Sequence, residues 1–221
     1  MTPRPPAPKQ YDEEYLPSYA PEVGVGAHPL PWPTDPRLDP ELLATGDRRN
    51  VIDRYRYWSV EAIVQDLDTR RHPFEVAIEN LAHDMNIGTI VRTANAFMAR
   101  RIHVVGRKRW NRRGAMVTDR YQHIEYQPDA EHLCKHALRE GLVIIGIDNL
   151  PGSQPIEHAE LPESAILLFG QESTGLSEQA VAACASLYSI SQFGSTRSMN
   201  AGVAAGIAMH TWIGQHANIA P

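Results

Sequence analysis

The sequence predicts an α/β fold in three layers, with a mostly parallel sheet covered by helices on both faces. Two observations lead to this prediction. From residue 74 onward, short β-rich segments alternate with segments of helical periodicity. Residues 142–147 and 165–169 are near-continuous apolar runs, which are typical of parallel strands buried on both faces. The order of these segments favours an open α/β domain, and the chain contains no internal repeat.

Each element of this domain is placed by its own local pattern. In the first helix Ile87, Ile90 and Val91 recur at helical spacing. Gly141 closes the second helix and Ser177 caps the third. The predicted elements are, in chain order, a strand at 74–78, a helix at 86–99, a strand at 102–105, a helix at 129–140, strands at 142–147 and 165–169, a helix at 177–185, a strand at 187–190 and a helix at 199–215.

The first third of the chain differs in composition. Of the 17 prolines, 11 lie within residues 1–40, and proline excludes regular helix and central strand, so residues 1–47 are expected to form an extended arm. We expect it to pack along a surface or a dimer contact, with RNA contact as the second choice, because it carries the aromatic residues Tyr11, Tyr15, Tyr19 and Trp32. Residues 48–72 are interpreted as a helical linker, and residues 73–221 as the α/β domain. In the linker an apolar face is formed by Trp58, Ile63, Val64 and Leu67.

Composition limits the class of protein. A hydrophobic fraction of 43% and a charged fraction of 21% are typical of a soluble globular protein. The N-terminal ten residues hold no apolar region of the secretory type, and no run reaches the 18 apolar residues of a membrane span. The two cysteines, Cys134 and Cys184, exclude a disulfide framework and indicate a cytoplasmic location.

A local basic segment stands out from a net charge of −5. Seven cations and Trp110 occur within residues 100–113, which suits a phosphate backbone together with a stacking surface. We expect this segment to form a loop beside the active site. The residues predicted to bind RNA are Arg107, Lys108, Arg109, Trp110, Arg112 and Arg113, with Arg100 and Arg101 completing the basic run.

Three glycine-containing segments lie where a predicted strand leads into a turn or helix. They are 84–97 (DMNIGTIVRTANAF), 169–176 (FGQESTGL) and 190–207 (ISQFGSTRSMNAGVAAGI). Ligands of open α/β sheets bind at such positions. None of the three is GxGxxG or GxxxxGK[ST], so a dinucleotide fingerprint or a phosphate loop is not supported.

Taken in order, the three segments resemble the motifs of the SpoU, or TrmH-like, branch of the SPOUT RNA methyltransferases. The first is similar to the family's Asn-x-Gly-x-x-x-Arg helix start, the second to its Gly-x-Glu-x-x-Gly loop and the third to its Ser-Leu-Asn helix entry, with Met199 in place of leucine. The resemblance covers residues 74–215. It implies a homodimer with a C-terminal deep trefoil knot that binds S-adenosylmethionine (SAM) and methylates a ribose 2′-hydroxyl of RNA.

The same resemblance assigns the site. The residues that it implies to be catalytic are Asn86, Arg92, Glu172, Ser198 and Asn200, and those that it implies to bind the cofactor are Phe169, Gly170, Glu172, Gly175, Ile190 and Met199. Arginine is almost always protonated, so we favour Arg92 as a stabiliser of phosphate and alkoxide over a literal base. Glu172 is expected to brace its loop. No metal is required, because the sulfonium already makes the methyl group electrophilic.

Alternatives remain open at this point. A catalytically silent knotted RNA-binding module is the second hypothesis, and an unrelated α/β nucleotide-binding enzyme the third. Among RNA substrates, tRNA is favoured over rRNA, because residues 1–71 do not resemble a compact RNA-binding domain. His132 and His136 flank Cys134 at helical spacing, but without a third ligand in view we expect an exposed helix face rather than a metal site.

Overall fold

The computed structural model describes residues 24–80, 86–171 and 174–218. The chain divides into two compact units, Met1–Ile63 and Val64–Pro221. The division falls within helix α2 (Val60–Asp68), inside the segment that the sequence assigns to a helical linker. Along the described residues, no helix is both long and apolar enough to cross a membrane.

The first unit contains the short helix α1 (Pro40–Thr45) and the 3-10 turn η2 (Asp53–Tyr55). The prediction of an extended arm without regular helix is therefore wrong for the six residues of α1. Proline is tolerated at the first turn of a helix because the N–H that it lacks has no partner there. The Asp39 carboxylate caps the helix, accepting from the backbone N–H groups of Glu41 and Leu42.

A buried carboxylate organises the first unit. Asp47 accepts hydrogen bonds from the Arg49 side chain at 2.8 and 2.7 Å and from the backbone N–H of Tyr57 at 3.0 Å. Burial alone would raise the pKa of Asp47. The hydrogen bonds and the Arg49 charge outweigh this effect, so the pKa of Asp47 is lower than its usual value. Trp58 is buried as expected, with the Arg37 guanidinium 4.2 Å from its ring centre.

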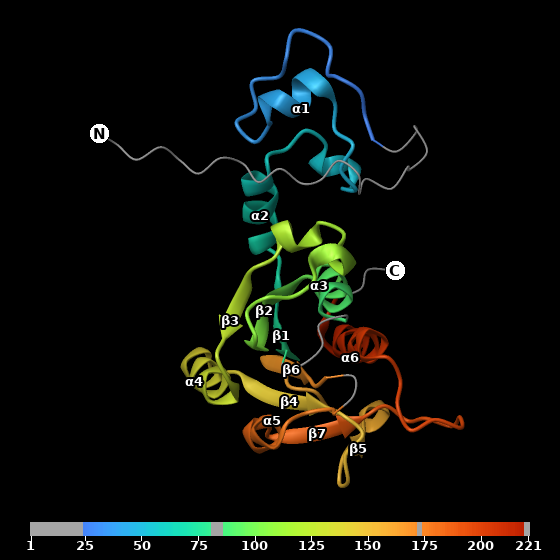
Figure 1. Cartoon of the computed structure of the whole chain (residues 1–221). Helices are drawn as coiled ribbons and strands as arrows, with labels where there is room; N and C mark the ends of the chain where they lie inside the picture. Colours follow the sequence, from blue (N-terminus) through green and yellow to red (C-terminus); the bar gives the residue numbers. More distant parts are fainter. Residues whose placement is uncertain (1–23, 81–85, 172–173, 219–221) are drawn as a thin grey trace. The chain divides into compact units, whose positions relative to one another are not determined.

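The second unit is built on a seven-stranded sheet in the order β3-β2-β1-β6-β4-β7-β5 (Figure 1). All strand pairings within the described sheet are parallel. This confirms the predicted α/β class and the mostly parallel sheet. The strands are β1 (His72–Asn80), β2 (Ala99–Gly106), β3 (Ile124–Gln127), β4 (Val143–Ile147), β5 (Gln154–Pro155), β6 (Ala165–Phe169) and β7 (Ser186–Ser189).

Four helices cover the sheet in two pairs. Helices α3 (Ile87–Ala96) and α6 (Ala201–His216) share one core with alternate β1 residues such as Phe74 and Val76. Helices α4 (Ala130–Glu140) and α5 (Glu178–Ala183) share the other core, which includes Ala77 of β1. Because β1 is buried on both faces, its side chains point alternately into one core and the other. The three-layer arrangement is therefore the one that the sequence predicts.

Every strand and helix predicted in this unit is present, with its ends moved by a few residues. The expected helix ends are also confirmed, since Gly141 takes the left-handed conformation and Ser177 accepts from the backbone N–H of Ala180. The Asp129 carboxylate, which was not predicted as a cap, accepts from the backbone N–H of His132. The sequence analysis missed the edge strands β3 and β5. It also missed the 3-10 turns η3 (Arg112–Ala115), η4 (Thr118–Tyr121) and η5 (Ile156–His158).

A close backbone contact joins α3 to the segment that follows β2. A Cβ added to Gly88 would lie 2.7 Å from both Gly114 Cα and the Ala115 nitrogen. Because only glycine permits this approach, Gly88 fixes η3 and the basic segment before it against the start of α3.

We predict that Gly88→Ala lowers the free energy of unfolding by about 2 kcal/mol, because the added methyl group overpacks a backbone contact. Gly214→Ala is the matched control, since this α6 glycine has no atom within 4 Å of an added Cβ. It should raise stability by up to about 1 kcal/mol through helix propensity. Urea unfolding measures both, and equal stabilities of the two variants would contradict the contact.

Candidate functional site

A cavity of about 290 Å³ lies at the carboxyl ends of β4, β6 and β7. Ligands of parallel α/β sheets bind at this edge. The wall combines apolar side chains with polar groups from the segments that follow the three strands. It is formed by Ile147, Asp148, Asn149, Leu150, Phe169, Gly170, Gln171, Thr174, Gly175, Ile190, Gln192, Arg197, Ser198, Met199, Ala201 and Ala204.

The cavity gathers residues from two of the three sequence motifs. Five of the six residues predicted to bind the cofactor line it, namely Phe169, Gly170, Gly175, Ile190 and Met199. Ser198, predicted to be catalytic, lines it as well. Glu172, which is predicted for both roles, lies outside the described residues.

The glycine loop, as residues 170–176 are called here, is closed at its base by its described residues at the end of β6. Gln171 and Gly175 exchange two backbone hydrogen bonds of 3.1 and 2.9 Å. A Cβ on Gly170 would fall 2.2 Å from the Gly175 carbonyl carbon. Gly175 itself has a φ of +67°, which disfavours residues with a side chain. Both glycines are therefore required by the shape of the loop.

Asp148 holds the glycine loop from the neighbouring strand end. Its carboxylate accepts from the backbone N–H of Leu176 at 2.7 Å. The sequence analysis did not select Asp148, although it directly follows the apolar run at 142–147. A polar residue placed immediately after a buried parallel strand was the signal that would have identified it.

A second segment, residues 190–199, completes the cavity and is called here the exposed loop. Near its start, Ser191 donates from its backbone N–H and its hydroxyl to the Glu157 carboxylate at 2.9 and 3.1 Å. Near its end, the Asn149 amide donates to the Arg197 carbonyl at 3.0 Å. Like Asp148, Asn149 follows β4 and was not predicted. It joins the end of β4 to the entry of α6.

The other predicted catalytic residues lie outside the cavity wall. The Asn200 side chain donates to the Asn86 side-chain oxygen at 2.9 Å, and it also caps α6 by accepting from Gly202 and Val203. The first and third motifs are thus joined by a direct bond. Arg92 is exposed on α3, and its guanidinium has no partner in the part of the chain that the structure describes. The structure therefore brings Asn86 and Asn200 together, next to Ser198 along the chain, and leaves Arg92 open to solvent.

The basic loop, residues 107–113, is held by a buried side chain of β1. The Asn80 amide donates to the carbonyls of Arg107 and Arg109 at 2.7 and 2.9 Å. The charged side chains of the loop are exposed. Trp110 is half-buried against the core, so it offers less stacking surface than expected, and the Arg112 guanidinium lies 5.6 Å from its ring centre.

The sequence profile of the SpoU rRNA Methylase family matches residues 73–210. The chain belongs to this family. Among its relatives is YacO of Bacillus subtilis (strain 168), which is named as a TrmH family tRNA/rRNA methyltransferase. It is 23% identical over 192 residues, which cover 79% of this chain and 74% of YacO. The tRNA/rRNA methyltransferase slr0955 of Synechocystis is 29% identical, and the match covers 71% of this chain and 42% of that protein.

Solved structures show the same fold. The A. aeolicus TrmH/SpoU tRNA modifying enzyme superposes with a TM-score of 0.62 at 21% identity, covering 71% of this chain and 81% of that one. AviRb of Streptomyces viridochromogenes, solved with AdoMet, gives a TM-score of 0.59 at 25% identity, covering 68% and 60%. SpoU membership confirms the predicted methyltransferase class and its cofactor, SAM.

Two cations of the predicted basic run belong to a different part of this SpoU domain. Arg100 and Arg101 lie on β2, where Arg100 binds Glu75 and Arg101 pairs with Glu125 at 3.0 Å. The expectation of one continuous patch from 100 to 113 is therefore wrong. Both side chains pair with carboxylates of the sheet, whereas the cations of the basic loop are exposed.

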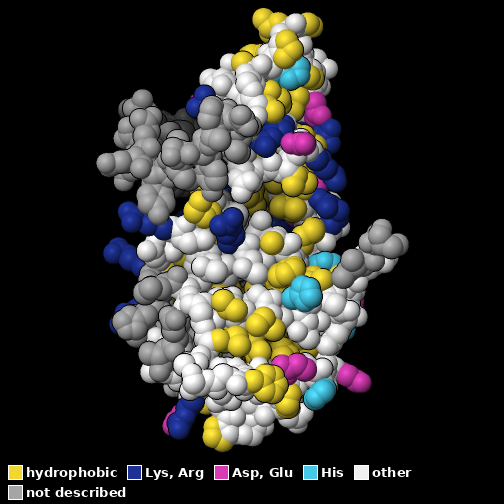
Figure 2. Space-filling model, turned by 90° about the vertical axis from the view of Figure 1, so that its right-hand side faces the viewer, with side chains coloured by type: hydrophobic (Ala, Val, Ile, Leu, Met, Phe, Trp, Pro, Cys, Tyr) yellow, Lys and Arg dark blue, Asp and Glu magenta, His cyan; other side chains and the backbone are white. Residues whose placement is uncertain are grey.

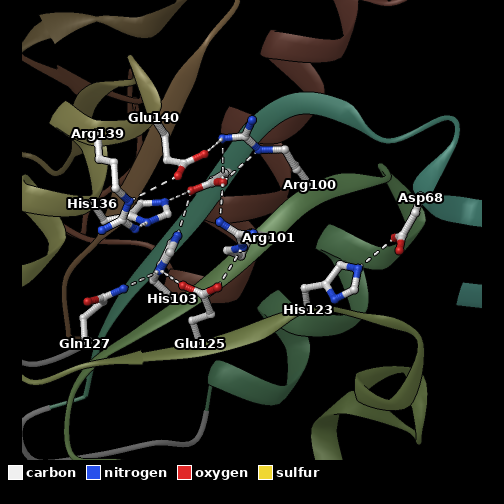
Figure 3. Close-up of polar contacts among 11 residues, drawn as sticks. Asp68, Arg100, Arg101, His103, His123, Glu125, Gln127, His136, Arg139 and Glu140 are labelled. Atoms are coloured by element: carbon white, nitrogen blue, oxygen red, sulfur yellow. Dashed lines mark hydrogen bonds and ion pairs between the residues drawn. The ribbon is translucent and has the colours of Figure 1, made fainter. Parts of the chain in front are cut away.

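The centre of this ion-pair network is the buried carboxylate of Glu75, whose partners Arg100, His103 and His136 are labelled in Figure 3. His103 Nε2 and His136 Nε2 both lie 2.8 Å from Glu75 Oε2. The prediction of an exposed helix face is wrong for His136, because this side of α4 packs on the sheet over Glu75. His132 is exposed and bonds to Asp129, as expected for a surface position.

The residue types of this network also occur in metal sites, and the ligand atoms of Glu75, His103 and His136 lie within 4.8 Å of one another. Their outer partners favour hydrogen bonding. The Arg139 side chain, which can only donate, lies 3.1 Å from His136 Nδ1, and the Gln127 amide nitrogen lies 3.1 Å from His103 Nδ1. His136 Nδ1 therefore accepts, which makes His136 Nε2 a donor to Glu75, and the Gln127 nitrogen beside His103 Nδ1 fits the same arrangement at His103.

We predict an acid-sensitive contribution of Glu75 to stability. Burial raises its pKa, but hydrogen bonds from His103 and His136 and the Arg100 charge outweigh it and lower the pKa to about 2 from 4.5. A lowered folded-state pKa stabilises the protein above pH 4.5, and this contribution is lost as the pH falls from 4.5 towards 2.

Urea midpoints between pH 6 and 2.5 test this for the wild type, Glu75→Gln and the exposed control Glu61→Gln. The wild type and the control should lose more stability in this window than Glu75→Gln. A parallel loss in all three, or stoichiometric zinc in the purified protein, would contradict the hydrogen-bonded arrangement.

We predict that Asp148→Ala weakens SAM binding about tenfold, because the glycine loop loses the acceptor for the Leu176 N–H. Asp148→Asn should lose less, since its amide oxygen still accepts. Calorimetric titration with SAM measures both, with circular dichroism as the control for folding. Unchanged affinity in Asp148→Ala would show that this bond does not shape the cavity.

Proposed function

We propose that this SpoU methyltransferase transfers the methyl group of SAM to a ribose 2′-hydroxyl of structured RNA. The observation that carries the proposal is the cavity, which collects the residues of the second and third motifs at one sheet edge. Among the relatives, RlmB of Neisseria meningitidis is named a 23S rRNA (guanosine-2′-O-)-methyltransferase and is 38% identical over 69 residues, covering 31% of this chain and 27% of RlmB.

The cavity suits SAM by its chemistry. Ile147, Phe169 and Met199 provide apolar surface for an adenine ring, and the Asp148 carboxylate provides a negative charge for a cationic ligand. When bound, SAM supplies a methyl group on a positively charged sulfur. The glycine loop and the exposed loop hold the cofactor from two sides, and the proposed main-chain contacts are at Gly170, Ile190 and Met199.

The chain's own residues act on the ribose. A ribose hydroxyl attacks only when its proton leaves or its developing charge is stabilised. The exposed Arg92 guanidinium orients the nucleotide through phosphate and stabilises the alkoxide. The bonded pair Asn86 and Asn200, with Ser198 beside it, keeps the Arg92 helix in register with the cavity. Glu172 braces the glycine loop.

RNA binding relies on the basic loop. The side chains of Arg107, Lys108, Arg109, Arg112 and Arg113 are exposed on a segment fixed by Asn80 and by the Gly88 contact. A rigid group of cations suits the phosphate backbone of a folded RNA. We favour tRNA over rRNA as the substrate, on the composition of residues 1–71.

The assembly is also part of the proposal. Figure 2 views the side of the second unit that carries α3 and α6 and shows hydrophobic side chains gathered on it. On α6, Val203 and Ile207 are exposed, which supports a homodimer through this face. We further propose that the C-terminal segment forms the family's trefoil knot, and that residues 1–47 act as an arm at the dimer or RNA contact.

The activity is tested with labelled SAM and unmodified tRNA and ribosomal RNA in separate reactions, followed by nucleoside mass spectrometry. A 2′-O-methylnucleoside is expected, mainly from the tRNA pool. A methylated base instead of a methylated ribose would overturn the reaction, and SAM and RNA binding without transfer would favour the silent RNA-binding module.

We predict that Arg92→Ala lowers kcat by about 10²–10³, as expected when a donor to a developing oxyanion is removed. Arg92→Lys should recover part of the loss, because the charge returns without the planar fork. The Kd for SAM should not change, since Arg92 does not line the cavity. Single-turnover kinetics with saturating RNA and calorimetry with SAM check both parts, and undiminished transfer in Arg92→Ala would remove this residue from the mechanism.

A further inference from the structure

The exposed loop presents an aromatic side chain directly to solvent. Phe193 is 98% exposed, more than any other large apolar side chain in the part of the chain that the structure describes. Its neighbours Gly194, Ser195, Thr196 and Arg197 are also exposed, and in Figure 1 the segment between β7 and α6 projects from the second unit. Phenylalanine is usually buried in a protein core, so this position requires an explanation.

The loop that carries the exposed Phe193 is anchored on both sides of this residue. The Glu157 carboxylate fixes the loop two residues earlier through both hydrogen-bonding groups of Ser191. Asn149 fixes it four residues later through the Arg197 carbonyl. The stretch that carries Phe193 is therefore anchored at both ends, and the Phe193 side chain between the anchors is exposed.

The position of Phe193 ties it to the cavity. Gln192, directly before it, lines the cavity, as do Arg197 and Ser198 after it. The Arg197 guanidinium has no partner among the residues that the structure describes. The loop that lines the cavity thus carries an exposed apolar ring and, four residues later, a cation without a partner among the described residues.

We propose that Phe193 is a stacking platform for a nucleobase of the RNA substrate, with Arg197 contacting a neighbouring phosphate; this rests on the proposed function. A flat ring beside a cation is the combination that binds unstacked nucleotides, since every base has a π-face and every nucleotide a phosphate. A ribose hydroxyl alone offers few contacts through which the enzyme can position the nucleotide. Stacking the adjoining base fixes the nucleotide while Arg92 and the cavity act on its sugar.

The test compares Phe193→Ala, Phe193→Leu and Phe193→Trp with the wild type, using in vitro transcribed tRNA and ribosomal RNA. Leu138→Ala is the matched control, because Leu138 is 82% exposed on α4 and does not line the cavity. The measurements are RNA affinity, KM and kcat for RNA, the Kd for SAM, and the molar mass in solution. We expect Phe193→Ala to weaken RNA binding about tenfold, with SAM affinity and mass unchanged. Phe193→Trp should retain binding, whereas Phe193→Leu should not.

Four results would contradict the stacking role of Phe193 or the proposed function. RNA affinity equal to that of the wild type in Phe193→Ala would overturn the proposal, as would full recovery by leucine, because leucine cannot stack. A lower molar mass in Phe193→Ala would overturn it in favour of a contact between two copies of the chain. If the wild type binds SAM but neither binds nor methylates either RNA, the proposed function itself fails, and that result is visible before any variant is compared.

Discussion

The structure depends on the requirement that polar groups buried in strand β1 be hydrogen-bonded, since an unpaired buried group costs several kcal/mol. Three polar side chains of β1 are buried, and each binds a different segment. Glu75 joins β2 to α4, Glu79 accepts from the backbone and hydroxyl of Ser177 at the start of α5, and Asn80 holds the basic loop. One central strand therefore sets the positions of the segment that follows the glycine loop, of the basic loop and of a covering helix.

Much of this arrangement could be predicted from the sequence because the relevant signals are local. Apolar runs identified β4 and β6, and Gly141 and Ser177 located two helix ends. The glycine loop was also predictable, since its shape excludes side chains at Gly170 and Gly175. Edge strand β3 was missed because its residues, Ile124–Gln127, are largely polar and carry no apolar run.

The remaining features are set by contacts between distant residues, which local patterns do not report. His136 resembles a surface residue in sequence but is buried, because its partner Glu75 lies 61 residues earlier. The basic run reads as one patch, yet Arg100 and Arg101 lie on β2 and pair with carboxylates, whereas the charged side chains of residues 107–113 are exposed. The family resemblance located the second and third motifs, and the structure added Asp148 and Asn149, whose side chains bond to the segments that follow these motifs' strands.

Because the sheet is parallel, strand β1 is synthesised well before its neighbour β6. Central strand β1 pairs with β6, so that Glu75 meets Ile166 roughly 90 residues later in the chain. A ribosome adds about 5–20 residues per second, so one edge of β1 stays unpaired for several seconds after it is synthesised. Such non-local pairing gives a high contact order, which slows folding. During that interval the unpaired edge of β1 is open to other chains, so chaperone protection matters most before β6 is synthesised.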